Sequence, residues 1–485
     1  MITTLNFEGH AVFVYPQETV ASALRRNNFE IALHCGGKNR CGSCRILLLS
    51  GTFVSDGKIL TVSEDNPVEV NSCSLKMLTN GAAKYCKREH SKTTPCLQMP
   101  EIPKNFQPTL VLDLGTTNVE GVLLRNGTFN SASQVNRQTV FGDNIIDRIA
   151  FASNSDNRIR LIDALIKDTL QPLISALTDT PEEISKIIVA GNTAMTHFFF
   201  DADTEKLGKS PFQPDRLKFS SIAGKLGLGI VPADTPVVSI SCLGGFIGGD
   251  VTAGLFFTGF GKEDSCELFM DIGTNCEILL NKHGRFYALS AAAGPAFERN
   301  NVRADAISAV KHVAFENNEW KMSPQKTELS GYCGTALIDL LAEGRQHGFL
   351  NTFAQWVNTP DLPEKLQCSN GMLAELLTAK AAIESALLLL FKHADVTAES
   401  LDRIYLAGNF SQNLNLANAK FIRLLPDLPD ERFIRCGNAA LNGSILCALN
   451  PQILSLTEKI RQMTLVLNPA EEPDYTHYFT SAMSL

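Results

Sequence analysis

The strongest constraint on how this chain folds is a short pattern that it contains twice. Residues 110–124 read LVLDLGTTNVEGVLL, and residues 268–280 read LFMDIGTNCEILL. In each copy an apolar run ends in Asp, a Gly-Thr turn follows and a second apolar run begins, which predicts a β-hairpin. The backbone of such a turn can cradle phosphate while the Asp faces a metal ion. Asp113 and Asp271 lie 158 residues apart, so the two copies also predict an internal duplication.

A third segment extends this pattern near the end of the chain. Residues 403–413, RIYLAGNFSQN, predict a buried strand that runs through a glycine turn into a helix. Because glycine has no Cβ, such a turn lets an adenine–ribose unit approach the backbone closely. The three segments together predict a nucleotide site assembled from distant parts of the chain.

With these three motifs in this order, residues 109–485 resemble the ATPase superfamily of acetate kinase, sugar kinases, heat-shock chaperones and actin. The resemblance implies two similar α/β lobes, approximately 109–265 and 266–485, that close over Mg-ATP. It implies that Asp113 and Asp271 act as catalytic carboxylates through metal-bound water, although both could be plain turn-capping residues. The nucleotide-binding residues that it implies are Gly115, Thr116, Thr117, Gly273, Thr274, Asn275, Gly408 and Asn409.

Cysteines are concentrated in the first hundred residues, which hold six of the thirteen. Cys35, Cys41 and Cys44 form a C-x5-C-x2-C loop broken by glycines, and Cys73 follows 28 residues later. Three thiolates on one loop and one distant thiolate suit a [2Fe–2S] cluster, and the loop resembles that of vertebrate-type and related bacterial ferredoxins. A zinc site is the alternative, but the second C-x2-C pair is missing. Cys86 is the alternative to Cys73 as the fourth ligand.

The chain is therefore predicted to be a multi-domain α/β protein. Residues 1–90 are expected to form a β-grasp [2Fe–2S] ferredoxin domain, which begins with a hairpin over 3–14 and a helix capped by Thr19. Residues 91–108 belong to a stretch with four prolines and no apolar periodicity, which predicts a linker. Residues 109–485 are expected to form the two-lobed actin-like ATPase domain.

Charge and hydropathy exclude several kinds of partner. The formal net charge is −8, and no basic run stands out, so neither nucleic acid nor an anionic membrane is an expected partner. No apolar stretch reaches the length of about 18 residues that a membrane span needs. The N-terminus lacks the pattern of a secretory signal, so we expect a cytoplasmic protein.

The combination of a [2Fe–2S] domain with this ATPase fold resembles the reductive activators of corrinoid-dependent methyltransferases, including the activating enzymes of anaerobic O-demethylase systems. Further blocks that resemble the family lie at 136–149, 189–200, 243–254, 291–298, 331–344 and 379–385. The resemblance implies an ATP-dependent enzyme that passes one electron from the cluster to an inactive Co(II) corrinoid, giving Co(I). It implies ATP, Mg²⁺ and the cluster as cofactors.

The partners implied are a corrinoid protein of a methyltransferase system and an upstream electron donor, and the family resemblance leaves room for a homodimer. Two other functions remain open at this point. One is ATP-dependent electron donation to another metalloenzyme, as in the dehydratase activators. The other is a non-catalytic iron–sulfur redox sensor whose ATPase fold binds partners.

Overall fold

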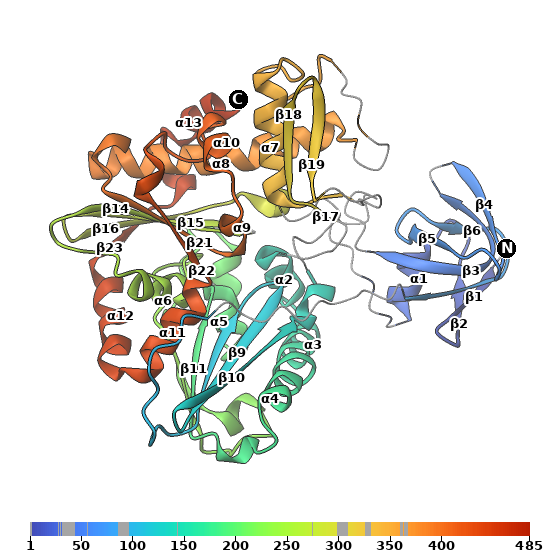
Figure 1. Cartoon of the computed structure of the whole chain (residues 1–485). Coiled ribbons are helices and arrows are strands. Elements are labelled where there is room, and N and C mark those ends of the chain that lie inside the picture. The colour runs from blue at the N-terminus through green and yellow to red at the C-terminus, as the bar shows by residue number, and fades with distance from the viewer. Residues whose placement is uncertain are drawn as a thin grey trace. The chain divides into compact units, whose positions relative to one another are not determined.

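The computed structural model describes residues 2–27, 29, 31, 44–55, 57–85, 97–142, 144–273, 275–297, 309–324, 331–358, 362 and 367–485. The chain divides into two compact units. The first comprises Met1–Ser91 and Gln138–Asp143, and the second comprises Lys92–Arg137 and Asn144–Leu485. Figure 1 shows the strands and helices of both units.

The first unit is a mixed β-sheet with one short helix. Strands follow the order β2-β1-β7-β3-β4, and both β5 and β6 pair with β3. The predicted N-terminal hairpin is present, and Thr19 caps the following helix by accepting the N–H of Ser22 at 3.3 Å. The bounds are β1 Thr3–Phe7, β2 His10–Val14, α1 Val20–Arg26, β3 Arg45–Ser55, β4 Lys58–Val62, β5 Val68–Asn71, β6 Lys76–Met77 and β7 Gly81–Tyr85.

The second unit contains two six-stranded sheets, both visible in Figure 1, that share the order of five of their strands. The sixth strand differs, because β12 pairs with β13 at one end of the first sheet, whereas β23 pairs with β16 at the opposite end of the second. In the first sheet β10, β9 and β8 form an antiparallel meander, and β11 and β13 continue it in parallel. In the second sheet β16, β15 and β14 form the meander, and β21 and β22 continue it. The shared order confirms the internal duplication. The bounds are β8 Thr109–Leu114, β9 Asn118–Arg125, β10 Thr128–Val135, β11 Lys186–Gly191, β12 Ser220–Ile222, β13 Pro236–Ser239, β14 Cys266–Ile272, β15 Cys276–Lys282, β16 Arg285–Ala291, β21 Arg403–Ala407, β22 Phe433–Gly437 and β23 Thr464–Val466.

Two helices connect the sheets by crossing over each other. Helix α6 (Gly249–Thr258) follows the first sheet, yet its Val251 and Leu255 belong to a core cluster with residues of the second sheet. Helix α11 (Ala439–Leu449) follows the second sheet, and its Leu441 and Ile445 pack with residues of the first. At the crossing a Cβ on Gly443 would lie 1.9 Å from the carbonyl oxygen of Ala253. The two backbones therefore touch, which only a glycine permits.

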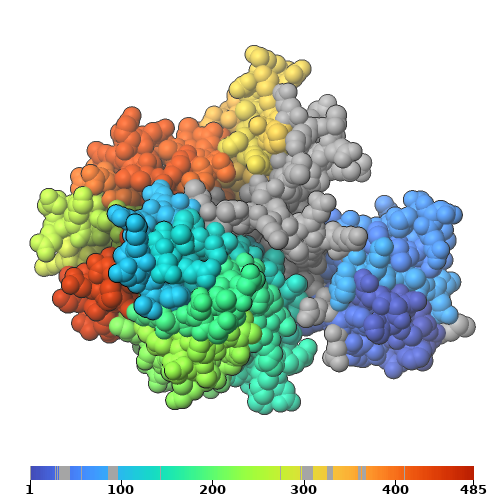
Figure 2. Space-filling model, turned by 60° about the horizontal axis from the view of Figure 1, so that its bottom comes forward, coloured from blue at the N-terminus to red at the C-terminus, as the bar shows by residue number. Residues whose placement is uncertain are grey.

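Among the remaining helices, α4 packs on β9 and β10 of the first sheet, and α8 packs on β15 and β16 of the second. Helix α13 packs on α8, and α7 packs on β18. Figure 2 shows the second unit from another side, where the cyan and green surface of the first sheet's segment adjoins the orange and red surface of later residues. The helix bounds are α2 Ile145–Phe151, α3 Ser155–Leu165, α4 Gln171–Leu177, α5 Thr193–Phe199, α7 Gly334–Gln346, α8 Asn370–Ala394, α9 Asn409–Gln412, α10 Leu416–Phe421, α12 Pro451–Met463 and α13 Tyr475–Ala482. The short strands in this part are β17 Ala309–Val310, β18 His312–Glu316, β19 Glu319–Ser323 and β20 Gly331–Tyr332. Across the part of the chain that the structure describes, no helix has the length and apolar character needed to cross a membrane.

The segment before the first sheet has irregular structure but is packed. Residues 97–108 contain no helix or strand. Leu97, Met99 and Ile102 nevertheless pack into the same core cluster as α11, and the N–H of Gln98 donates to Asn442 Oδ1 at 2.9 Å. This end of the proline-containing stretch is therefore anchored to the second unit.

Candidate functional site

The first Asp-Gly-Thr motif forms the predicted hairpin between β8 and β9. Asp113 lies opposite Glu120 in the antiparallel register, so both carboxylates belong to the same end of the hairpin. In the turn, a Cβ on Gly115 would meet the carbonyl oxygen of Asn118 at 2.2 Å. Only glycine fits this position, because any side chain would push the two strands apart.

The turn after Asp113 is held by polar side chains from other elements. Asn136 Nδ2 donates to the carbonyl of Gly115 at 2.9 Å, and the buried Arg148 donates to the carbonyl of Thr116 at 2.6 Å. Asn192 Nδ2 donates to Thr116 Oγ1 at 3.1 Å. The carbonyl of Thr117, a residue exposed at the tip of the turn, accepts the N–H of Asn136. The turn is therefore rigid, as a phosphate cradle requires.

The second motif repeats this arrangement between β14 and β15. Asp271 lies opposite Glu277 in the register. The N–H of Gly273 donates to the carbonyl of Asn275 at 2.8 Å and so closes the turn, while Thr274 lies outside the described residues. Each hairpin therefore presents an Asp–Glu pair, so the duplication includes the paired carboxylates.

The predicted adenosine motif meets the second hairpin. Gly408, between β21 and α9, has φ +81°, and a Cβ there would lie 2.8 Å from Asp271 Oδ1. The structure therefore brings Gly408 and Asp271 together, although they are far apart in the sequence. Asn409 begins α9, and the placement of its side chain lies outside what the structure describes.

A fifth carboxylate, Asp250, lies at the N-terminal end of α6. A Cβ on the preceding Gly248 would meet the carbonyl oxygen of Gly191 at 2.2 Å and Asp250 Oδ1 at 2.6 Å, so the helix start is packed closely. The charge of Asp250 raises the pKa values of Asp113, Asp271 and Glu277. Asp250 therefore lies within electrostatic reach of both hairpins.

Burial and mutual repulsion make this cluster unfavourable when every group is ionised. Burial is the main cause in each case, and it raises the pKa of Asp250 to about 6 and that of Asp271 to about 7. Burial and the neighbouring carboxylates raise the pKa values of Asp113 and Glu277 well above their usual range. Each side chain still keeps partial access to solvent. Such a cluster is stabilised by a cation that enters it.

The donor set fits a magnesium–nucleotide complex better than a bare metal ion. Among the described side chains, no lysine or arginine forms an ion pair with any of these five carboxylates. Nor does the described part of the chain hold a group of three Asp, Glu, His or Cys residues close enough to bind a metal directly. Mg²⁺ usually keeps several waters and takes only one or two carboxylates together with phosphate oxygens. Carboxylates that are too far apart to bind one metal ion directly can hold Mg²⁺ in this way, through its waters and the phosphates.

Sequence reasoning found part of this cluster. It named Asp113 and Asp271 and placed both in paired hairpins, which the structure confirms; their roles with nucleotide stay predictions. It missed Glu120, Glu277 and Asp250 as members of the site. A signal was present for the first two, because each copy of the repeat carries a Glu in its second strand. For Asp250 the signal was open to two interpretations, because the Gly-Gly-Asp run at 248–250 predicts either a helix N-terminus that faces phosphate or a closely packed helix start. Only the crossing of α6 brings it to the hairpins.

Two of the four predicted cluster cysteines lie in described parts of the first unit. Cys44 immediately precedes β3, and its carbonyl accepts the N–H of Ser72 at 3.0 Å and Ser72 Oγ at 2.7 Å. Cys73 is therefore held next to Cys44, and both residues are buried. Cys35 and Cys41 lie outside the described residues, so the full ligand set stays a prediction.

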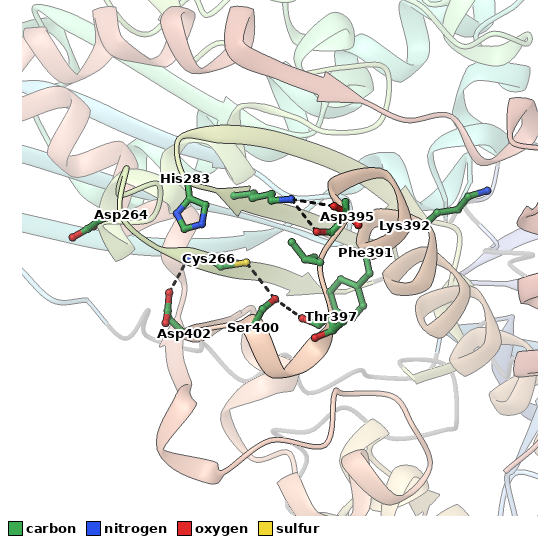
Figure 3. Close-up of a pocket in the computed structure, with 11 residues that line it drawn as sticks. Asp264, Cys266, His283, Phe391, Lys392, Asp395, Thr397, Ser400 and Asp402 are labelled. Carbon is green, nitrogen blue, oxygen red and sulfur yellow. Dashed lines mark hydrogen bonds and ion pairs between the residues drawn. The ribbon is translucent and has the colours of Figure 1, made fainter.

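A separate pocket of about 710 Å³ lies at the far end of α8, as Figure 3 shows. Most of its polar groups are used in hydrogen bonds to neighbouring protein atoms. Lys282 Nζ donates to the carbonyls of Ala394 and Asp395, and Asp402 accepts the N–H of Cys266. These contacts close the C-terminal end of α8 and leave the pocket without a converging set of reactive groups. The lining residues are Asp264, Cys266, Lys282, His283, Phe391, Lys392, Asp395, Val396, Thr397, Ser400 and Asp402.

Comparison with protein families matches three consecutive parts of the chain. Residues 4–78 match the 2Fe-2S iron-sulfur cluster binding domain. Residues 109–263 match the RACo middle region, and residues 265–485 match the C-terminal domain of RACo, the ASKHA domain. The N-terminal match covers Cys35, Cys41, Cys44 and Cys73, and the later two matches each contain one Asp-Gly-Thr hairpin.

Relatives are found among curated proteins and solved structures. The corrinoid activation enzyme RamQ of Eubacterium limosum is 28% identical over 76% of this chain and 69% of its own length. A [Co(II) methylated amine-specific corrinoid protein] reductase of Methanosarcina barkeri is 21% identical over 68% of each chain. The solved structure of a reductive activator for corrinoid, iron-sulfur protein covers all of this chain and 98% of its own, with 21% identity and a TM-score of 0.67, which shows a shared fold.

Proposed function

We propose, from the premise that the chain belongs to the RACo-type family of ferredoxin–ASKHA fusion proteins, that it is an ATP-dependent reductive activator of corrinoid proteins. Its substrate is a corrinoid protein of a methyltransferase system in the inactive Co(II) state. The reaction adds one electron to cobalt and gives Co(I), the form that accepts a methyl group. The relatives' names, which describe corrinoid activation and Co(II) corrinoid protein reduction, support this function.

The first unit would provide the electron. A [2Fe–2S] cluster supplies one-electron transfer at a potential near −400 mV when it is of the plant type. We infer that Cys44 and Cys73 hold it together with Cys35 and Cys41. The burial of Cys44 and Cys73 would keep water away from their thiolates. An upstream electron donor must reduce the cluster again after each turnover.

The second unit would provide the energy. The Co(II)/Co(I) couple lies below the potential of such a cluster, and each 100 mV of uphill transfer costs about 2.3 kcal/mol per electron. We propose that Asp113 and Asp271 orient Mg²⁺ through water. The turns at Gly115–Thr117 and Gly273–Asn275 would hold the phosphates, and Gly408 would leave room for the adenosine. ATP-driven closure of the two lobes would then favour a docked state of the corrinoid protein.

Asp250 adds a candidate for the residue that positions the attacking water. It lies within electrostatic reach of both Asp113 and Asp271, and burial raises its pKa to about 6. A carboxylate with a pKa near the working pH can accept a proton from water while it remains largely ionised. We propose that Asp250 acts as this base for ATP hydrolysis.

The observation that most directly supports ATP use is that Gly408 lies against Asp271, while Asp250 lies within electrostatic reach of both Asp–Glu hairpins. The test is ATP hydrolysis by the full chain, measured anaerobically with and without a Co(II) corrinoid protein from the same organism. We expect the corrinoid protein to stimulate hydrolysis, and the same corrinoid protein already reduced to Co(I) to stimulate it less. No stimulation by several such partners would contradict the proposal and would favour the redox sensor. Association into a homodimer and a cytoplasmic location are further predictions.

A further inference from the structure

Asn438 lies at the junction between β22 and α11, and both polar atoms of its side-chain amide form hydrogen bonds. Its Oδ1 accepts the N–H of Leu441 at 2.8 Å, which makes it the N-cap of α11. Its Nδ2 donates to Glu120 Oε2 at 2.5 Å. The two contacts fix the orientation of the amide, because only the oxygen can accept and only the nitrogen can donate.

The partner of this amide belongs to the carboxylate pair of the first hairpin. Glu120 and Asp113 are directly opposite each other in the register of β9 and β8, where like charges destabilise a sheet. Asn438 relieves part of that repulsion. Its hydrogen bonds lower the pKa values of Glu120 and Asp113 against the larger, opposing effect of burial.

The second hairpin lacks an equivalent contact among the described residues. There Ser290 Oγ, on the neighbouring strand β16, donates to Glu277 Oε1 at 3.2 Å. The first pair is thus tied to a helix from the other half of the duplication, whereas the second pair is tied within its own sheet. Since α11 also touches α6 at Gly443 and Ala253, Asn438 connects Glu120 to the helix crossing that joins the two sheets.

We propose that Asn438 is a positioning residue for nucleotide: through its hydrogen bond to Glu120 it holds the Asp113–Glu120 pair in the arrangement that a magnesium–nucleotide complex requires. This inference rests on the proposed ATP-dependent function. Asn438 then has a second role besides capping α11. It connects nucleotide binding at the first hairpin to α11, the helix that crosses between the sheets.

The direct test is Asn438→Asp in the full chain, with the dissociation constant for Mg-ATP measured by isothermal titration calorimetry. Asp caps helices as well as Asn, so the cap of α11 is kept while the donor to Glu120 is replaced by another carboxylate. We expect Mg-ATP binding to weaken about tenfold or more, because a charged hydrogen bond is lost beside the phosphates. Binding within about twofold of the wild type would show that Asn438 serves only as a cap and would overturn the proposal.

A double variant separates positioning from a general disturbance. In Glu120→Gln with Asn438→Asp, the amide and the carboxylate exchange places, so the hydrogen bond can re-form in the opposite direction. We expect this double variant to recover Mg-ATP affinity to within about threefold of the wild type. A double variant that binds no better than Asn438→Asp alone would contradict the proposal.

The matched control is Asn450→Asp, the same change at the N-cap of α12. Asn450 Oδ1 accepts the N–H of Gln452 at 3.0 Å, and this residue lies outside the carboxylate cluster. We expect its Mg-ATP affinity to equal that of the wild type, and an equal loss in both variants would count against the proposal. Wild-type protein that fails to bind Mg-ATP would instead contradict the proposed function itself, so the two failures are distinguishable.

Discussion

At the scale of single residues, the site consists of charges that the fold leaves uncompensated. Burial raises the pKa values of Asp113, Asp250 and Asp271, the charge of Asp250 raises those of Asp113 and Asp271 further, and none of the three has an ion-pair partner among the described residues. Such an arrangement costs stability in the absence of ligand, and that cost is regained when a cation and phosphates bind. The unfavourable cluster is therefore evidence for a binding role, because packing alone gives no reason to collect carboxylates.

This reasoning predicts how the second unit's stability depends on pH. The folded pKa of Asp250 is about 6, above its value of about 3.9 in an unfolded chain. Between about pH 4 and 6 the folded state therefore binds more protons than the unfolded state. The contribution of Asp250 to the free energy of unfolding falls as pH rises through that window. Without nucleotide, we expect Asp250→Asn to raise the free energy of unfolding by about 1–2 kcal/mol at pH 7.5, and by less at pH 4.5.

Urea unfolding at the two pH values measures this difference. Asp156→Asn, in the exposed first turn of α3, is the control, and we expect it to have little effect at either pH. The Asp250 variant should also lose ATP hydrolysis. Equal stability of Asp250→Asn and wild type at pH 7.5 would mean that Asp250 is not held in an unfavourable environment.

A second prediction at this scale concerns the fourth cysteine ligand of the cluster. The hydrogen bonds from Ser72 to the carbonyl of Cys44 place Cys73 beside a predicted ligand. We expect Cys73→Ser to lose most of the [2Fe–2S] absorbance and bound iron after anaerobic purification, while Cys86→Ser keeps both. The opposite result would assign the fourth ligand to Cys86.

At the scale of elements, local sequence was enough to predict hairpins, glycine turns and a helix cap, because contacts between residues close in sequence form them. Both Asp-Gly-Thr hairpins, the N-terminal hairpin, the helix capped by Thr19 and the strand–turn–helix around Gly408 are present as expected. Their signals are apolar periodicity, caps and glycine turns, all of which act within a few residues. The sheet order was not predicted, because it depends on how distant segments pair.

Lys380 shows that a local sequence pattern cannot predict contacts between residues far apart in the chain. A lysine on a long amphipathic helix usually faces solvent, but the side chain of Lys380 is fully buried. Its Nζ pairs with Glu384 and donates to the carbonyls of Ala482 and Ser484, a hundred residues away. For the same reason the sequence did not predict Asn438 and left the role of the helix start at Asp250 open, since a helix crossing brings both residues to the site.

The helix crossing gives a prediction of its own. A Cβ on Gly443 would lie 1.9 Å from the backbone oxygen of Ala253, so Gly443→Ala forces α6 and α11 apart. We expect a loss of about 3 kcal/mol or more in the free energy of unfolding, despite the better helix propensity of alanine. Gly371→Ala, exposed in the first turn of α8, should be neutral or slightly stabilising. Chemical denaturation compares the two, and equal stabilities would show that α6 and α11 can separate at little cost.

At the scale of the whole molecule, the chain combines two kinds of machinery with different evidence for each. The electron-transfer part is the 2Fe-2S domain in the first unit, for which four cysteine ligands are predicted, and the nucleotide part is the ASKHA domain with its duplicated sheet in the second. The sequence pattern predicted both, because each depends on short motifs. The pairing of the two in one chain is what favours electron transfer driven by ATP over a simple kinase or a simple ferredoxin.

The central claim is that ATP drives one-electron reduction of a Co(II) corrinoid. The most direct measurement mixes the anaerobically reduced full chain with a Co(II) corrinoid protein from the same organism and follows the visible spectrum with and without Mg-ATP. The account predicts that the Co(I) band rises only when Mg-ATP is present, and that Asp271→Asn abolishes the rise while the cluster spectrum is kept. Equal formation of Co(I) without nucleotide, or cobalt that stays Co(II) with several such partners, would contradict it.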